Sequence, residues 1–145
     1  MQVSIHIKSR QRRAELDDTP DAISQDAVGL YTPTEGGFTL CYDDPDPSMG
    51  GKVTLTYTAK GKKLMLERVQ PAGRTVMIFT EGVSTECVYR TPYGTLPLSI
   101  RTSKLGVLTL GRTFSITLRY RLESAGMDTM EIEFSLLAKQ RRDEA

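Results

Sequence analysis

The chain has 145 residues, of which 39% are hydrophobic and 26% charged, and its formal net charge is +1. A chain of this length forms one domain and buries about 68–70% of its unfolded surface, so it needs no disulfide or metal to fold. The composition excludes a largely disordered protein, and the balanced charge gives no support to a strongly basic nucleic-acid binder. No run approaches ~18 consecutive apolar residues, the length of a transmembrane helix. The opening MQVSIHIKSR alternates rather than forming the apolar block of a signal peptide, so we predict a cytoplasmic protein with no membrane partner.

The charges are unevenly distributed along the chain. Residues 1–14 hold four bases and no acid, residues 15–46 hold nine acids and no Lys or Arg, and the remainder holds fifteen bases and nine acids. This polarity predicts an acidic edge and a basic edge on the folded protein. Solvated loops, kept apart for solubility, are the simpler explanation of this polarity, so segment 15–46 is not assigned as a binding edge.

The strongest pattern along the chain is strict alternation of apolar and polar residues. Its apolar positions are Val3, Ile5 and Ile7; Phe38, Leu40 and Tyr42; Val53, Leu55 and Tyr57; Leu96, Leu98 and Ile100; Phe114, Ile116, Leu118, Tyr120 and Leu122; and Met130, Ile132, Phe134 and Leu136. Alternation predicts strands with one face on a core and one toward water. Shorter apolar runs predict further strands at 64–69, 75–80, 85–90 and 105–110. No window has a sustained helical period.

Turn signals rich in Gly, Pro and Asp separate these runs. Short strands separated by turns every ~8–12 residues predict an all-β sandwich or barrel. We expect eight or more antiparallel strands in a single domain over residues 1–138, closed or nearly closed, followed by a charged tail over 139–145.

The last two long strands can be placed relative to each other. Both put even-numbered residues on the core face, so the loop between them has an odd length. A three-residue loop over 124–126 places Arg119 opposite Glu131. A loop over 125–127 places Arg119 opposite Glu133 and Arg121 opposite Glu131. In either register the outer face carries a structural arginine–glutamate ladder rather than an acid–base site.

Seven segments of the chain carry a family resemblance: Gly36-Gly37 with FTLCYDD, GKVTLTYTA, LMLERV, VMIFTEG, YRTPYGTLPLSIRTSKL, ITLRYRL and MEIEFSLL. Together they span nearly the whole chain and resemble the YwiB-like bacterial proteins, a family of unknown function. The TPYG turn and the strand after it are the most specific part of the resemblance. It implies an antiparallel, up-and-down, calycin-like (lipocalin-related) closed β-barrel and carries over no catalytic residue. The chain departs from the family pattern in the acidic segment 15–26 and the DDPDPSMGG loop.

The sequence supplies little for catalysis or metal binding. His6 is the only histidine and lies on the polar face of its strand, and the motifs GxSxG, GxxxxGK[ST] and GxGxxG are all missing. Asp43, Asp44 and Asp46 cluster, but Pro45 and Pro47 disturb the spacing of a calcium loop. Zinc has no ligand set. We therefore expect no catalytic residue, no metal and no cofactor.

Binding is better supplied than catalysis. Tyr42, Tyr57 and Tyr120 lie on the apolar faces of their strands, and Arg68 is in phase with the core positions of its own strand. An arginine there needs a tyrosine hydroxyl, an acid or a bound anion, since an unpaired buried charge is very costly. A small barrel can hold one small ligand among such side chains. The alternative is that Arg68 reaches the rim and the tyrosines fill the barrel ends.

A second function is an RNA- or protein-interaction surface. The basic residues of segment 8–13 could meet Lys139, Arg141 and Arg142 if the first and last strands pair. No Phe or Tyr lies in residues 1–14 or 138–145, so base stacking is poorly served and nucleic acid is the weaker prediction. The sequence also leaves room for a homodimer. Cys41 and Cys87 lack a CxxC spacing and are predicted to be free thiols, with Cys41 facing away from the core.

Overall fold

The computed structural model describes residues 1–13, 21–44, 51–70, 73–91, 94–124 and 129–141. Within them the chain forms ten β-strands and no helix. The strands are β1 (Gln2–Arg13), β2 (Asp21–Thr34), β3 (Gly37–Asp43), β4 (Lys52–Thr58), β5 (Lys63–Gln70), β6 (Gly73–Thr80), β7 (Ser84–Thr91), β8 (Gly94–Leu110), β9 (Thr113–Glu123) and β10 (Met130–Gln140).

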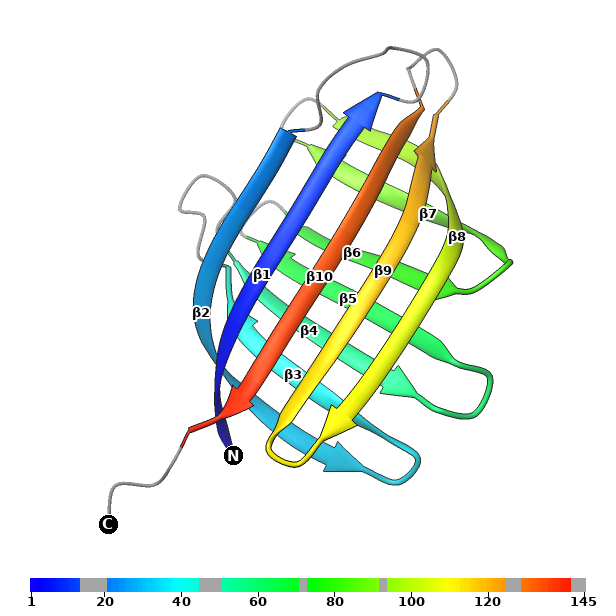
Figure 1. Cartoon of the computed structure of the whole chain (residues 1–145). Coiled ribbons are helices and arrows are strands. Elements are labelled where there is room, and N and C mark those ends of the chain that lie inside the picture. The colour runs from blue at the N-terminus through cyan, green and yellow to red at the C-terminus, as the bar shows by residue number, and fades with distance from the viewer. Residues whose placement is uncertain (14–20, 45–50, 71–72, 92–93, 125–128, 142–145) are drawn as a thin grey trace.

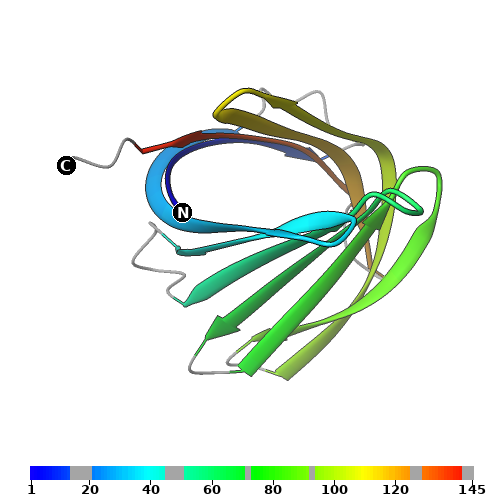
Figure 2. The same ribbon diagram turned by 90° about the horizontal axis from the view of Figure 1, so that it is seen from below.

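One antiparallel sheet contains all ten strands in the order β6-β5-β4-β3-β2-β1-β10-β9-β8-β7. Apart from the pairing of β1 with β10, every neighbouring pair is consecutive in the chain, which is up-and-down topology. The sheet curls on itself so that β3 to β6 face β8 to β10 across the interior (Figures 1 and 2). The prediction of an all-β, up-and-down antiparallel barrel is confirmed, and the architecture is consistent with a calycin-like barrel.

The barrel is nearly closed rather than closed. β6 and β7 are the two ends of the sheet and share no backbone ladder, although the turn between them brings their ends together. The amide of Gly82 in that turn donates to the carbonyl of Thr102 on β8 over 2.9 Å. β8 has its register shift between Thr102 and Lys104. The turn is therefore bonded to β8 instead of extending a β6–β7 ladder, which leaves a seam.

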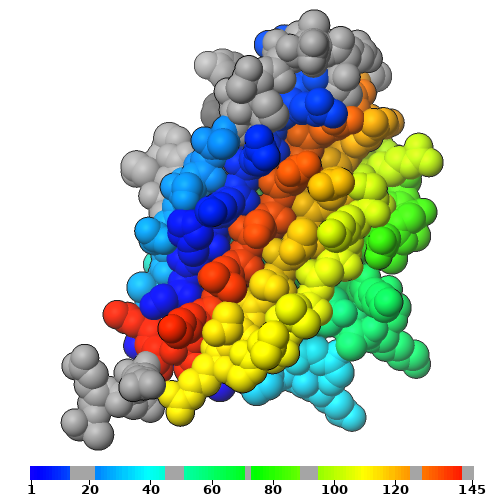
Figure 3. All heavy atoms as spheres, in the orientation of Figure 1, coloured from blue at the N-terminus to red at the C-terminus, as the bar shows by residue number. Residues whose placement is uncertain are grey.

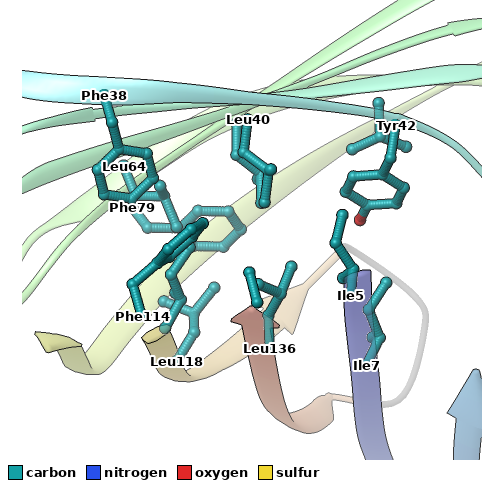
Figure 4. Packing of buried hydrophobic residues seen from close by; sticks show 14 of the residues in the cluster. Ile5, Ile7, Phe38, Leu40, Tyr42, Leu64, Phe79, Phe114, Leu118 and Leu136 are labelled. Atoms are coloured by element: carbon teal, nitrogen blue, oxygen red, sulfur yellow. The ribbon is translucent and has the colours of Figure 1, made fainter. Parts of the chain in front are cut away.

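The predicted inward faces line the interior. All six alternating sets are buried or half-buried on their apolar side, and eighteen buried residues form one core cluster. Side chains from facing walls, such as Leu40 and Leu136, point toward one another (Figure 4). The register of β9 and β10 is the second of the two predicted, with Arg119 opposite Glu133 and Arg121 opposite Glu131.

β2 is the strand that sequence patterning missed. Its inward face carries Gly29 and the half-buried Ala27 and Tyr31, whereas Val28 and Leu30 point outward and are exposed. Because β2 has apolar residues on both faces and acids among them, its sequence does not show the alternation of apolar and polar residues that identifies a strand. A Cβ on Gly29 would lie 2.7 Å from both the Cys41 carbonyl oxygen and Ile5 Cδ1, so β1, β2 and β3 pack too closely there for a side chain.

Several other predictions are refined by the strands. The runs at 96–100 and 105–110 belong to one long strand, β8, and β10 continues to Gln140, two residues beyond the predicted domain boundary. Cys41 lies beside Thr54 on the outer face, and its sulfur accepts a hydrogen bond from Thr54 Oγ1 over 3.6 Å. Both cysteines are free thiols. Some predictions concern residues that the structure does not describe. These are Asp46, Arg142, the acids of 15–18 and most of the loops at 92–94 and 124–127.

Candidate functional site

One end of the barrel is filled by aromatic side chains. Tyr31, Phe38, Tyr57 and Phe114 contact one another with ring centroids 4.6–5.5 Å apart. They come from the β2–β3 hairpin, from β4 near its end and from β9 at its start. Large rings at this separation leave no room for a ligand, so this end of the barrel is part of the core.

The opposite end contains a cavity of about 500 Å³. It lies where β1, β3, β5 and β9 end and where β2, β6, β8 and β10 begin. Most of its wall is apolar, from Ile7, Ile23, Leu66, Met77, Leu96, Leu98, Leu122, Met130, Ile132 and Phe134. Its polar groups come from Ser9, Gln11, Gln25, Tyr42, Asp44, Arg68, Thr75, Tyr120 and Ser124. An apolar cavity with a few polar groups is the usual form of a small-molecule site.

Arg68 and Asp44 form an ion pair in this wall. Nη1 of Arg68 donates to Oδ2 of Asp44, and only 19% of the Arg68 side chain and 8% of the Asp44 side chain are exposed. Arg68 lies opposite Val53 on β4, in phase with Leu64 and Leu66 as predicted. Asp44 directly follows β3, and its amide donates to the Gly51 carbonyl over 3.0 Å. The partner that the arginine requires is thus a protein acid.

Two of the three predicted tyrosines share the cavity with this pair. Burial raises the pKa of Tyr42 to about 12; the positive charge of Arg68 opposes this rise, and the negative charge of Asp44 adds to it. Burial likewise raises the pKa of Tyr120 to about 12, again opposed by Arg68. Both phenols therefore remain protonated at neutral pH. They are hydrogen-bond donors and acceptors without charge.

The structure brings Arg68, Tyr42 and Tyr120 together, and it places Tyr57 elsewhere. Tyr57 lies on the same barrel face but packs on Phe38 in the aromatic end, at a ring separation of 5.5 Å. Alternation reports which face a residue occupies and not how far along the barrel it lies.

Asp44 is the site residue that sequence reasoning missed. It lies two positions after Tyr42, so the alternation of Phe38, Leu40 and Tyr42 continues to it and could have identified it. The acidic cluster drew attention to a calcium loop instead. Among the described residues no three His, Cys, Asp or Glu side chains come close enough to hold a metal ion.

His6 has two partners on the outer face of β1 and β2. Its Nδ1 lies 2.6 Å from Oδ1 of Asp26, and its Nε2 lies 3.2 Å from the Ser24 hydroxyl. The side chains of His6 and Asp26 are 40% and 85% exposed. The order of groups is that of a hydrolase triad. However, these residues line neither the interior cavity nor the trough that the arginines of β1 and β9 border on the outer face.

The basic segments predicted to meet do not meet. β1 and β10 are paired as expected, but they are antiparallel with Arg12 opposite Glu131 and Ser4 opposite Lys139. Segment 8–13 therefore lies at the start of β10, and Lys139 at its other end. The basic residues of β1 instead neighbour the arginines of β9.

An up-and-down barrel with a largely apolar interior cavity that holds an ion pair defines the class of protein, and comparisons with known proteins give its family. Residues 5–136 match the family described as Domain of unknown function (DUF1934), and the chain belongs to that family. The resemblance to YwiB-like proteins is thereby confirmed. The structure is similar to the crystal structure of the ywiB protein from Bacillus subtilis, with a TM-score of 0.80 and 18% identity over 97% of this chain and 92% of that one. That likeness supports the fold.

No curated protein matches the chain. Within the described residues, no helix is long and apolar enough to cross a membrane.

Proposed function

We propose that this protein binds a small, uncharged amphipathic molecule in the open end of its barrel. The observation that carries the proposal is the Arg68–Asp44 pair, which lies in the wall of an otherwise largely apolar cavity of about 500 Å³. Cavities that bind drug-sized ligands span roughly 300–1,000 Å³.

The charge of the cavity favours a neutral ligand. Asp44 neutralises Arg68, and the two tyrosines stay protonated because their pKa values lie near 12. A ligand with a full charge would lose its hydration without gaining an opposite charge, which is costly in a poorly hydrated cavity. Arg68 nevertheless has further N–H donors beyond the one that Asp44 accepts. The polar end of the ligand is therefore a hydroxyl, carbonyl or amide.

The apolar wall of the cavity determines the chemistry of the rest of the ligand. Leu66, Met77, Leu98 and Phe134 line the cavity and offer surface to an aliphatic or aromatic body. Burial of apolar area gives about 25 cal/mol per Å², so the body supplies most of the affinity and the polar groups set its orientation.

Two measurements test the proposal. Native mass spectrometry of freshly purified protein should detect a co-purified small molecule. Titration with Nile red, an uncharged environment-sensitive dye, should give saturable fluorescence, and the anionic dye 8-anilinonaphthalene-1-sulfonate should bind at least tenfold more weakly. Equal binding of both dyes would contradict the neutral ligand.

A pair of matched variants localises the binding. Leu98→Trp fills the cavity and should abolish Nile red binding. Leu108→Trp makes the same change on the outer face, where Leu108 is 60% exposed, and should leave it intact. Loss of binding in both variants, or in neither, would show that the dye does not occupy the barrel.

A further inference from the structure

Eight charged side chains form two rows across the outer face of β1, β10, β9 and β8. Cross-strand partners give the first row as Arg10, Glu133, Arg119 and Lys104, and the second as Arg12, Glu131, Arg121 and Arg101. Each row therefore reads base, acid, base, base from β1 to β8. These four strands lie side by side on one face of the molecule (Figure 3). We call these side chains the arginine rows.

The acids of the arginine rows orient three of the arginines. Glu131 accepts from Arg12 Nε and from Arg121 Nη2, each over 2.7 Å, and Arg119 lies 3.4 Å from Glu133. Hydrogen bonds, first from Arg12 and then from Arg121, lower the pKa of Glu131 against the opposing effect of partial burial. Glu131 therefore stays ionised and holds two guanidinium groups in fixed positions.

The remaining three bases of the rows form no ion pair among the described residues. Among the described residues, Arg10, Arg101 and Lys104 have no hydrogen bond or ion pair from their side chains. Arg101 lies directly opposite Arg121, and Lys104 directly opposite Arg119. Like charges in direct cross-strand positions destabilise a sheet, and both β8 residues are exposed, so packing does not require them. Cross-strand pairing therefore gives Arg101 and Lys104 no stabilising role in the sheet.

Seven of the eight residues of the rows, all but Lys104, line an open trough of about 730 Å³ on this outer face. Five arginines and two glutamates line it, together with the extra residue of the β8 bulge, Ser103. The two rows are two residues apart along each of β1, β10 and β9, or about 6.7 Å at the rise of a strand. Positive charge is thus presented repeatedly along the trough.

We propose that the arginine rows bind the phosphate groups of a nucleic-acid backbone without reading its sequence. Guanidinium groups match phosphate bidentately, and a nucleic acid repeats its charge at every nucleotide, so one strand can engage both rows. Tyr120 borders the trough but lies on the inward parity of β9, toward the cavity, so no aromatic ring is offered for base stacking. The site differs from the barrel cavity in place and in chemistry.

The decisive variant is the double reversal Arg101→Glu with Lys104→Glu. It converts both like-charge pairs into opposite-charge pairs with Arg121 and Arg119, so it should raise the thermal midpoint. It should weaken binding of a fluorescein-labelled 20-nucleotide RNA at least tenfold in fluorescence anisotropy at low salt. The slope of log affinity against log salt should fall by about 1.4 for two lost contacts to a single strand.

The matched control is Lys60→Glu with Lys63→Glu. It makes the same change in net charge on exposed lysines of the β4–β5 hairpin, on the opposite wall of the barrel (Figure 1). It should leave affinity within about twofold, because long-range charge effects are screened within ~10 Å at 0.1 M salt. An equal loss in both variants would overturn the proposal in favour of a net-charge effect.

Further binding experiments compare different polyanions. Single-stranded and duplex RNA of equal length distinguish the two sources of phosphate, and binding of either supports the site. Poly-glutamate at equal charge should compete at least tenfold less well than RNA. Equal competition would assign the trough to an acidic protein instead, and absence of RNA binding at 25 mM salt would overturn the proposal. Nile red binding is unaffected in every arm, which separates this site from the cavity.

Discussion

Arg68 and Asp44 decide the polarity of the barrel interior at the scale of single residues. Arg68 and Asp44 place a nearly buried ion pair in the cavity wall, at positions where apolar side chains would suffice for folding. Replacement of buried pairs by well-packed apolar residues is often neutral or stabilising, so such a pair is weak evidence for a role in stability. This is why the pair supports a binding function rather than a purely structural one.

Removal of one member of this pair should destabilise the protein strongly. Arg68→Met leaves the nearly buried carboxylate of Asp44 without the positive charge of the arginine, which should cost roughly 3–5 kcal/mol in urea denaturation. The double variant Arg68→Met with Asp44→Leu should recover most of that loss, because no charge is left alone. A single variant that loses less than about 1 kcal/mol would show that water solvates Asp44 in the folded state.

The two cavity tyrosines should make stability depend on alkaline pH. Their pKa rises from 10 in the unfolded chain to about 12 in the folded one. The folded protein therefore holds more protons between these values, so stability is fully present below pH 10 and falls as the pH rises toward 12. Each tyrosine should account for roughly 2–3 kcal/mol of that loss. Urea midpoints at pH 9 and 11 measure about half of it, roughly 1.4 kcal/mol per tyrosine, because the loss is complete only above pH 12.

The hydroxyls can be removed without loss of the rings. Tyr42→Phe with Tyr120→Phe should remove most of the decline in stability between pH 9 and 11. Tyr57→Phe is the matched control, because Tyr57 packs in the aromatic end, and it should leave the decline unchanged. A decline that persists in the double variant would assign it to other groups.

At the scale of elements, β1, β2 and β3 pack too closely at Gly29 to admit a side chain. Gly29→Ala places a Cβ 2.7 Å from a backbone carbonyl and from Ile5 Cδ1, and the backbone cannot yield cheaply. Overpacking of this kind costs about 1–3 kcal/mol, which chemical denaturation detects. Gly106→Ala on β8 is the control: its Cβ meets only Thr117 Cβ at 3.9 Å, so it should be neutral or stabilising. Equal effects would show that β2 has room to shift.

The open seam governs behaviour at the scale of the whole molecule. β1 is one of the two middle strands of the sheet, and both it and its neighbour β10 have a ladder on each side, whereas β6 and β7 each have one ladder. Hydrogen exchange should therefore be slowest in β1 and β10 and fastest at the seam-facing amides of β6 and β7. Exchange followed by NMR or mass spectrometry measures this order. Equal protection throughout would indicate a barrel that closes in solution.

The local pattern of the sequence determined much of the architecture. Alternation identified six of the ten strands or their parts, and shorter apolar runs identified three more. Alternation also assigned inward faces correctly, because a strand places successive side chains on opposite sides whatever its partners are. The same parity limited β9 and β10 to two registers, one of which is observed. The charge of Arg68 on an apolar face was enough to require a partner. These inferences depend on adjacent residues alone.

Only the tertiary structure decided where along the barrel each inward residue lies. Tyr57 and Tyr42 share a face but fall at opposite ends, and Asp44 meets Arg68 because β3 and β5 both end at the cavity. β2 escaped prediction because its outward face is as apolar as its inward one. The arginine rows assemble from β1 and the last three strands, which lie at opposite ends of the sequence, and antiparallel pairing separates Lys139 from them. Strand direction and register arise from packing of the whole chain, which no local pattern encodes.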